Sequence, residues 1–138
     1  MMKAEKIIVP AALNQIAPVT EMINKKMEEL NCSLRTRMHI RVAVDEIISN
    51  IVHYAYGNRR GTINVEVEAE ENPPYLSITF IDQGVPFNPL TARDPELAGS
   101  AKQRPVGGLG LYIVKKTMDM VYYEYKNNSN ILIIRKYV

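Results

Sequence analysis

The sequence predicts an α+β fold, a two-layer sandwich in which a mostly antiparallel sheet is covered by three helices on one face. Strand-like segments follow one another in pairs and helical segments are few, whereas a doubly wound parallel sheet would alternate the two. The length of 138 residues suits one domain and leaves little room for a second. We therefore expect a single domain over residues 1–138.

The expected elements rest on the spacing of apolar side chains. Apolar residues recur every three or four positions in helical segments and every second position in half-exposed strands. In chain order, this spacing predicts a strand at 6–9, helices at 14–30 and 33–56, strands at 62–69 and 75–81, a helix at 107–118, and a final hairpin with strands at 121–126 and 131–137.

The ends of these elements carry local signals. Pro10 closes the first strand, because proline cannot donate a hydrogen bond to a neighbouring strand. Asn14 is expected to cap the first helix, and Ser33 can cap the second. The glycine-containing segment 57–61 ends the second helix, and the final hairpin turns around residues 127–130.

One long segment, residues 83–106, shows no periodicity and contains several prolines. A stretch of this length without regular structure, inside a small domain, is typical of a lid or a binding loop. We therefore expect it to border a functional site.

Composition excludes several classes of protein. The net charge is only +2, so a strongly basic nucleic-acid-binding surface is not expected. The single cysteine, Cys32, excludes an internal disulfide framework and a cysteine metal cluster. The apolar run near the N-terminus is too short for a signal peptide, and no segment is long enough to span a membrane. We expect a cytoplasmic domain that binds neither nucleic acid nor a membrane.

The second expected helix carries a carboxylate and a carboxamide on one side. Glu46 and Asn50 lie four residues apart and share a face. An asparagine oxygen can bind Mg²⁺, and a glutamate can polarise a water or a hydroxyl group. A solvated polar stripe would explain the same residues. A zinc site made by His39, Glu46 and His53 is excluded, because seven-residue steps place such ligands roughly 10 Å apart.

A second motif, Asp82-Gln83-Gly84, follows the strand at 75–81. A carboxylate at the end of a strand can accept a hydrogen bond from an amino group such as that of adenine. Gly84 would allow a flat ligand to approach the backbone closely. An ordinary strand-ending turn would also explain these residues, since Asp and Gly are common in turns.

A third motif, Gly-Gly-Leu-Gly-Leu at residues 107–111, opens the last expected helix. Free N–H groups at a helix N-terminus can cradle phosphate when glycines remove side-chain obstruction. The motif is neither a P-loop nor a Rossmann fingerprint. A glycine-rich helix start without a ligand is the simpler alternative.

Together, and in this order, the three motifs supply contacts for the metal, the base and the phosphates of one nucleotide. The sequence here resembles the ATP-binding fold of the gyrase, heat-shock chaperone, histidine-kinase and MutL superfamily (the Bergerat fold). Within it, the sequence is most similar to the stand-alone anti-sigma factor serine/threonine kinases of bacterial partner-switching systems. The resembling segments are residues 44–50, 81–87 and 107–114, and size and element order match across essentially the whole chain.

The resemblance implies roles for individual residues. Glu46 would be the catalytic base, Asn50 a Mg²⁺ ligand, and Asp82 the residue that binds the adenine amino group. Gly84 would shape the adenine pocket. The phosphates of ATP would be cradled by Gly108, Leu109, Gly110 and Leu111.

Three further residues have less definite roles. Lys102 and Arg104, in the long loop, could stabilise the transferring γ-phosphate, although exposed loop cations are usually only solvated. The family often reads Asn-Ala-x-x-His-Ala-Tyr after the metal-binding asparagine. In this sequence His53 comes one place early, so no role is assigned to it.

The resemblance implies an enzyme that uses ATP and Mg²⁺ to phosphorylate a serine or threonine of a small antagonist protein. Family members also sequester a sigma factor as homodimers. The residues alone leave two other functions open: a non-catalytic adenine-nucleotide-gated binding module, and a plain interaction domain. The tyrosines of the final hairpin fit either a protein interface or the preference of aromatic residues for strands: Tyr122, Tyr123, Tyr125 and Tyr137.

Overall fold

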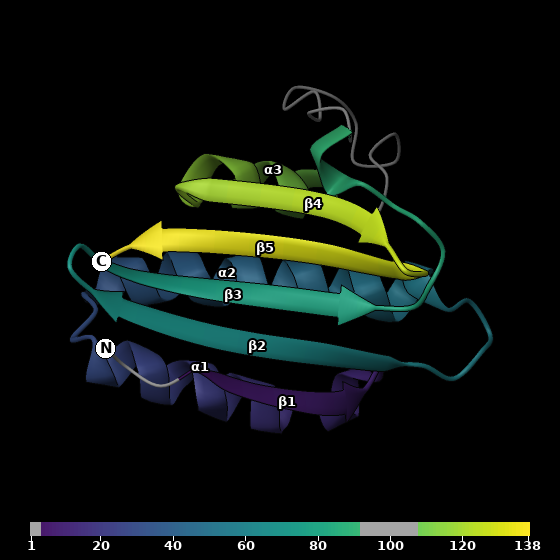
Figure 1. The fold of residues 1–138 in the computed structure, drawn as a ribbon, viewed down its shortest axis with the longest axis horizontal. Coiled ribbons are helices and arrows are strands. Elements are labelled where there is room, and N and C mark those ends of the chain that lie inside the picture. The colour runs from purple at the N-terminus through teal and green to yellow at the C-terminus, as the bar shows by residue number, and fades with distance from the viewer. Residues whose placement is uncertain (1–3, 92–107) are drawn as a thin grey trace.

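The computed structural model describes residues 4–91 and 108–138, which contain one five-stranded sheet with helices on one side (Figure 1). All strand pairs are antiparallel, and the order across the sheet is β1-β2-β3-β5-β4. The strands are β1 (Glu5–Pro10), β2 (Thr62–Glu71), β3 (Pro74–Asp82), β4 (Met120–Lys126) and β5 (Ser129–Tyr137).

The helices α1, α2 and α3 lie together behind the sheet in Figure 1. Their bounds are Ala17–Glu29, Leu34–Asn50 and Gly108–Thr117. The α+β fold predicted from the sequence, a two-layer sandwich with three helices on one face, is confirmed. The long segment expected at 83–106 lies partly outside the described residues, together with Lys102 and Arg104.

The core lies between the two layers and follows from the alternation of side chains along the strands. Every second residue of β2 and β3 is apolar and fully covered by the helices, so each of the large ones contributes about 1.5–3 kcal/mol to stability. The buried residues of this layer include Ile63, Val65, Val67, Leu76, Ile78, Phe80 and Ile134. The other face of the sheet is covered by no helix in the described part of the chain.

The first helix starts later than predicted. Asn14 belongs to a separate 3₁₀ turn, Leu13–Gln15, and the residue that caps α1 is Ile16, without a side-chain hydrogen bond. Pro18 lies in the first turn of α1, where its missing N–H costs nothing because the first helical N–H groups have no partner within the helix. The prediction of Asn14 as the N-cap is therefore wrong.

The second helix begins as predicted, because the Ser33 hydroxyl accepts a hydrogen bond from the Thr36 N–H at 3.2 Å. It reaches the expected length only by changing its geometry. After Asn50 the chain continues as a π-helical turn, η2 (Ile51–Ala55). Such wide turns are often found at functional sites.

The final hairpin turns over two residues. Asn127 and Asn128 have φ angles of 54° and 60°, as a two-residue type I′ turn requires, and asparagine tolerates this conformation. Lys126 pairs with Ser129, so Ser129 and Asn130 belong to β5. The prediction that residues 127–130 form the turn is too wide, and it hid the position of Asn130 on the sheet.

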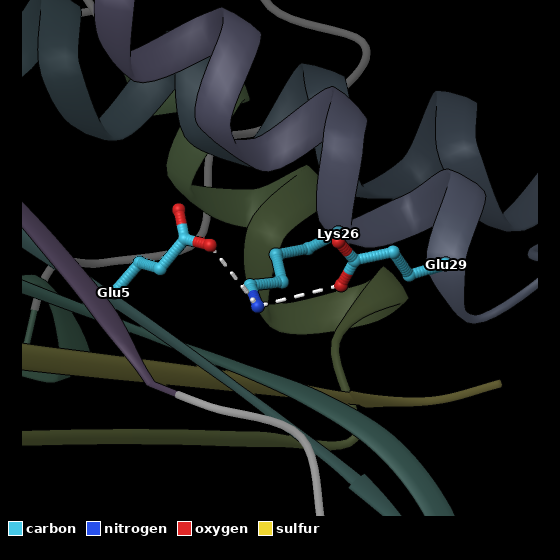
Figure 2. Close-up of polar contacts among 3 residues, drawn as sticks. All are labelled: Glu5, Lys26 and Glu29. Carbon is cyan, nitrogen blue, oxygen red and sulfur yellow. Dashed lines mark hydrogen bonds and ion pairs between the residues drawn. The ribbon is translucent and has the colours of Figure 1, made fainter.

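A buried cation connects α1 to the edge strand. The Lys26 side chain is only 3% exposed, and its ammonium group lies 3.4 Å from carboxylate oxygens of Glu5 in β1 and Glu29 in α1 (Figure 2). A charge held away from water is costly unless it is paired. The two carboxylates therefore make this burial possible and fix α1 against β1.

Candidate functional site

The last residue of β3, Asp82, places a buried carboxylate at one end of the sheet. It is 4% exposed and continues the helix-facing row of β3 after Phe80. Side chains from α2, η2, α3 and three strands join it around one largely apolar cavity. The residues lining it are Ile47, Asn50, Ile51, Tyr54, Ala55, Phe80, Asp82, Val85, Phe87, Pro89, Leu111, Tyr123, Asn130 and Leu132.

The two oxygens of the Asp82 carboxylate differ. Oδ1 accepts the Gly84 N–H at 2.9 Å and the Asn130 amide at 3.0 Å. Oδ2 receives no hydrogen bond from the residues that the structure describes. An ionised carboxylate only accepts hydrogen bonds, so Oδ2 suits a ligand that brings an amino group.

Gly84 is required by close contact with the end of the second helix. A Cβ added at Gly84 would lie 2.2 Å from the backbone oxygen of Ala55, a distance that no side chain tolerates. The same oxygen accepts the Val85 N–H at 2.8 Å. The carbonyl left without a helical partner at the end of η2 is thus satisfied by the segment after Asp82.

Tyr56 fixes the backbone of Gln83, the residue between Asp82 and Gly84. Its hydroxyl donates to the Thr62 carbonyl at 2.6 Å and accepts the Gln83 N–H at 2.9 Å. Gln83, like Gly84, is therefore fixed to a part of the chain that is distant in sequence. This makes the Asp82–Gly84 segment a defined wall of the cavity.

The structure adds a residue that the sequence reading did not single out. Asn130, at the start of β5, is 6% exposed and pairs with Asp82 across the β3–β5 ladder. Its amide nitrogen donates to Asp82 Oδ1 and to the Val85 carbonyl at 2.9 Å. Its amide oxygen accepts from the Phe87 N–H at 3.2 Å and from the Tyr123 hydroxyl.

The tyrosines of the hairpin separate into two groups. Tyr123 faces the cavity and is half-buried, whereas Tyr122, Tyr125 and Tyr137 are exposed. Burial, and to a smaller extent the charge of Asp82, raise the pKa of Tyr123, although a backbone hydrogen bond at Phe87 opposes the shift. Tyr123 therefore remains protonated and able to donate to Asn130 at neutral pH.

Glu46 and Asn50 lie on α2 where it meets the start of α3. A Cβ added at Gly110 would lie 2.0 Å from Glu46 Oε2, so the carboxylate rests directly against the first turn of α3. The Asn50 Nδ2 donates to the Glu46 carbonyl at 3.0 Å, which leaves the Asn50 Oδ1 available as a ligand.

Two residues at the start of α3 meet the other motifs. The helix begins at Gly108, the second residue of the predicted motif, so the N–H groups of its first turn have no partner within the helix. Leu111 lines the cavity, and Gly110 contacts Glu46. For Gly108 and Leu109, only their place at the start of the helix is described.

The structure thus brings Asn50, Asp82 and Leu111 to one cavity, with Gly84 behind its wall. Glu46 adjoins this group through Asn50 and Gly110 but does not line the cavity itself. His53 is exposed on η2, with its Nδ1 2.7 Å from the Ser49 carbonyl oxygen. Like Lys102 and Arg104, it gains no role from the described residues.

The residues present fit an adenine nucleotide. The cavity walls are apolar, as a flat base requires, and one unpartnered carboxylate oxygen is suited to an amino group. The glycine at position 110 keeps the space between α3 and Glu46 free of a side chain. Asn50 Oδ1 is an oxygen ligand of the kind that Mg²⁺ prefers.

No group of three or more His, Cys, Asp or Glu residues within 4–91 and 108–138 could hold a metal ion by itself. Among the helices of these same ranges, none has both the length and the apolarity needed to cross a membrane.

Comparisons with known proteins indicate one family. The family model for the histidine kinase-like ATPase domain matches residues 9–136. The serine-protein kinase RsbW of Listeria innocua is 30% identical over 72% of this chain and 64% of its own length. RsbW of Bacillus mycoides is 26% identical over 100% of this chain and 88% of its own.

An anti-sigma F factor of Clostridium beijerinckii is 24% identical over 95% of this chain and 82% of its own length. The matched part of this chain spans less than two thirds of the Listeria relative. These similarities confirm the family resemblance inferred from the three motifs.

Proposed function

The chain belongs to the histidine kinase-like ATPase domain family, and from this premise we propose that it is an ATP-dependent serine/threonine protein kinase of the anti-sigma factor type. It would phosphorylate a small antagonist protein and sequester a sigma factor in a partner switch. One observation carries the proposal. Asp82, whose Oδ2 has no hydrogen-bond partner among the described residues, lines the same apolar cavity as Asn50 and Leu111.

In this proposal Asp82 accepts a hydrogen bond from the amino group of adenine, and the apolar walls of the cavity contact the faces of the base. The start of α3, from Gly108 to Leu111, binds the phosphates through its backbone N–H groups. We call Asp82, Gly84, Asn130 and Tyr123 the adenine end of the site. Glu46, Asn50 and the first turn of α3 form its phosphate end.

Glu46 acts as the general base. Its carboxylate takes the proton of the acceptor hydroxyl as that oxygen forms a bond to the γ-phosphorus. The bond from the γ-phosphorus to the bridging oxygen breaks, and ADP leaves. The contact between Glu46 and Gly110 supports this role, because it places the carboxylate beside the turn that would bind the phosphates.

Asn50 would hold Mg²⁺ through Oδ1, with its nitrogen tied to the Glu46 carbonyl. When bound, the ion would neutralise part of the phosphate charge. The proposal further includes a homodimer, a cytoplasmic location, protein partners, and no direct contact with nucleic acid or membrane. It takes residues 1–138 as a single histidine kinase-like ATPase domain.

The proposal is tested by phosphoryl transfer. The purified chain is incubated with Mg·ATP labelled at the γ-position and a purified anti-sigma factor antagonist from the same genome. We expect label on one serine or threonine of the antagonist. The Glu46→Gln variant should bind ATP without transferring label, whereas Asp45→Asn, an equivalent change at the exposed neighbouring residue, should transfer normally.

Normal transfer by Glu46→Gln would refute the assignment of the base. ATP binding without transfer by the wild type would instead favour the non-catalytic module, which uses the nucleotide to gate a partner. Absence of any nucleotide binding would refute both.

A further inference from the structure

Asn130 is connected to more of the adenine end than any residue predicted from the sequence. Asn130 and Asp82 are 48 residues apart in the chain but face each other across β3 and β5. The hydrogen bonds of Asn130 reach Asp82, the backbone of Gly84, Val85 and Phe87, and the hydroxyl of Tyr123. One side chain thus connects β3, β4, β5 and the segment after Asp82.

The orientation of the Asn130 amide is determined by its neighbours. The Phe87 N–H and the Tyr123 hydroxyl both point donors at its Oδ1, while the Asp82 carboxylate and the Val85 carbonyl offer acceptors to its Nδ2. A flipped amide would place donor against donor and acceptor against acceptor. The carbonyl oxygen of Gly84, at 3.4 Å from Nδ2, is a further acceptor on the same side. Only one orientation of the amide satisfies these partners.

These partners also use the full capacity of the amide. An asparagine side chain has two N–H donors and two acceptor lone pairs. The two short donor contacts, at 3.0 Å to Asp82 Oδ1 and 2.9 Å to the Val85 carbonyl, account for both hydrogens. Asn130 therefore has no group left for a ligand, even though it lines the cavity.

The fixed Asn130 amide determines the orientation of the Asp82 carboxylate. Its Oδ1 receives both the Asn130 amide and the Gly84 N–H, and this fixes the plane of the carboxylate. Oδ2 is then the oxygen left to accept from a ligand. Without the Asn130 donor the carboxylate could rotate, and either oxygen could turn toward the other donors around it.

We infer that Asn130 is a positioning residue for base selection: with its amide held by Tyr123, it keeps Asp82 turned so that Oδ2 meets the amino group of an adenine. This inference rests on the proposed nucleotide site and deepens it. The chain of hydrogen bonds runs from the Tyr123 hydroxyl to Asn130 Oδ1, and from Asn130 Nδ2 to Asp82 Oδ1.

The test compares ATP with purine riboside 5′-triphosphate, which differs only by lacking the amino group of adenine. Calorimetric titration gives the ratio of the two affinities for each variant. For the wild type we expect a preference for ATP of about tenfold or more, since a hydrogen bond to a charged group is lost with the analogue. In Asn130→Ala the ratio of the two affinities should fall toward one, because ATP binds more weakly.

A purely structural role would weaken both ligands equally and leave the ratio unchanged. Tyr123→Phe, which removes only the hydroxyl donor, should lower the ratio in the same direction as Asn130→Ala but by less. Tyr122→Phe is the matched control, because among the described residues that hydroxyl bonds only Glu124, on an exposed part of the same strand. Its ratio should equal that of the wild type. If Asn130→Ala fails to fold, the tyrosine pair decides the question.

The Asn130→Asp variant tests the role of Asn130 through the pH dependence of its preference for ATP. The introduced carboxyl keeps the shape of the amide but faces Asp82, so two carboxylates compete for one proton. We expect its preference for ATP to be low at alkaline pH and to recover as pH falls, because the protonated carboxyl again donates to Oδ1. Taking the ratio of two triphosphates cancels protonation of the phosphates.

The outcomes separate the two levels of the proposal. If the wild type binds neither triphosphate, the proposed nucleotide site itself is refuted. If the wild type prefers ATP and Asn130→Ala and Tyr123→Phe keep that preference, the nucleotide site stands and the role of Asn130 is refuted. A reduced ratio in both variants, with an unchanged ratio in Tyr122→Phe, supports it.

Discussion

At the adenine end of the site, the side chain of Asp82 is fixed by donors from Gly84 and Asn130, and Asn130 is fixed in turn by Tyr123. At the phosphate end, Glu46 rests against the small residue Gly110, and the Asn50 side chain makes one hydrogen bond with the part of the chain that the structure describes, within its own helix. The adenine end is therefore a preformed wall. The phosphate end keeps its polar groups available.

The two ends of the site are therefore expected to respond differently to substitution. A carboxylate that recognises one edge of a flat base must have a defined orientation, and buried long-range hydrogen bonds supply it. Groups that bind a metal ion and move a proton need unused donors and acceptors. Substitutions at the adenine end should thus alter stability and selectivity, whereas those at the phosphate end should alter transfer.

The largest effect should come from the phosphate end. Glu46→Gln removes the proposed base and should lower phosphoryl transfer by about 10²-fold or more, the usual contribution of general base catalysis. ATP affinity and thermal stability should stay close to those of the wild type, since no described hydrogen bond joins Glu46 to the adenine end. Measuring the transfer rate and the ATP affinity of the same variant checks this. A parallel loss of both would contradict the separate roles of the two ends.

A pair of glycine substitutions compares the ends directly. Gly84→Ala pushes a methyl group against the fixed backbone oxygen of Ala55 at 2.2 Å, so we expect a loss of about 1–3 kcal/mol in the free energy of unfolding. Gly110→Ala meets the flexible Glu46 carboxylate at 2.0 Å, which can move aside. Its stability should change by less than about 1 kcal/mol, because alanine also favours helices.

Urea denaturation measures the stability of both glycine variants, and the transfer assay measures their activity. Gly110→Ala should lose transfer while remaining folded, because the displaced carboxylate no longer lies over the start of α3. Equal destabilisation by the two substitutions would show that the phosphate end is as rigid as the adenine end.

Asn50→Ala should remove the part of ATP affinity that depends on Mg²⁺. The expected loss is about tenfold in the presence of the ion, with little change when a chelator is added, because Asn50 offers an oxygen ligand. Calorimetric titration with and without Mg²⁺ checks this. An equal loss under both conditions would place Asn50 in base binding instead, since it also lines the cavity.

A smaller effect is expected with pH. Because burial raises the pKa of Tyr123, folding favours the protonated hydroxyl. The stability that this hydroxyl contributes is present in full below the ordinary tyrosine pKa of about 10 and is lost as pH rises through the higher value of the folded state. The difference in unfolding free energy between wild type and Tyr123→Phe should therefore be constant near neutrality and shrink above about pH 10. A difference that grows with pH would contradict the assignment of the hydroxyl as donor.

The smallest effect concerns a residue outside the site. Burial raises the pKa of Cys32, and the nearby Arg37 opposes the shift only in part. The thiolate is the reactive form, so the folded protein should react slowly with thiol reagents and become reactive when urea unfolds it. Fast labelling of the folded protein, without loss of stability, would contradict this.

The fold and the three motifs were readable from the sequence because their signals are local. Alternating apolar residues gave β2 and β3, the Ser33 cap gave the start of α2, and Asp82 and Gly110 appeared in short patterns. What could not be read was the partner of Asp82. Asn130 lies 48 residues away, and its role depends on the register of β3 with β5.

A local signal for Asn130 did exist. Two asparagines, at 127 and 128, are enough for a two-residue type I′ turn. That turn places Asn130 inside β5, two residues before Leu132, on the helix-facing side. The π-helical turn after Asn50 had no comparable signal, and its last residue, Ala55, contacts Gly84 and Val85, which are distant in sequence.

The proposed function requires that Asp82 and its cavity bind an adenine nucleotide. Calorimetric titration of the wild type and Asp82→Asn with ATP and Mg²⁺ measures this binding. We predict micromolar binding by the wild type, about −8 kcal/mol, and an affinity at least about tenfold weaker for Asp82→Asn. Equal binding by the two proteins, or no binding by the wild type, would contradict the claim.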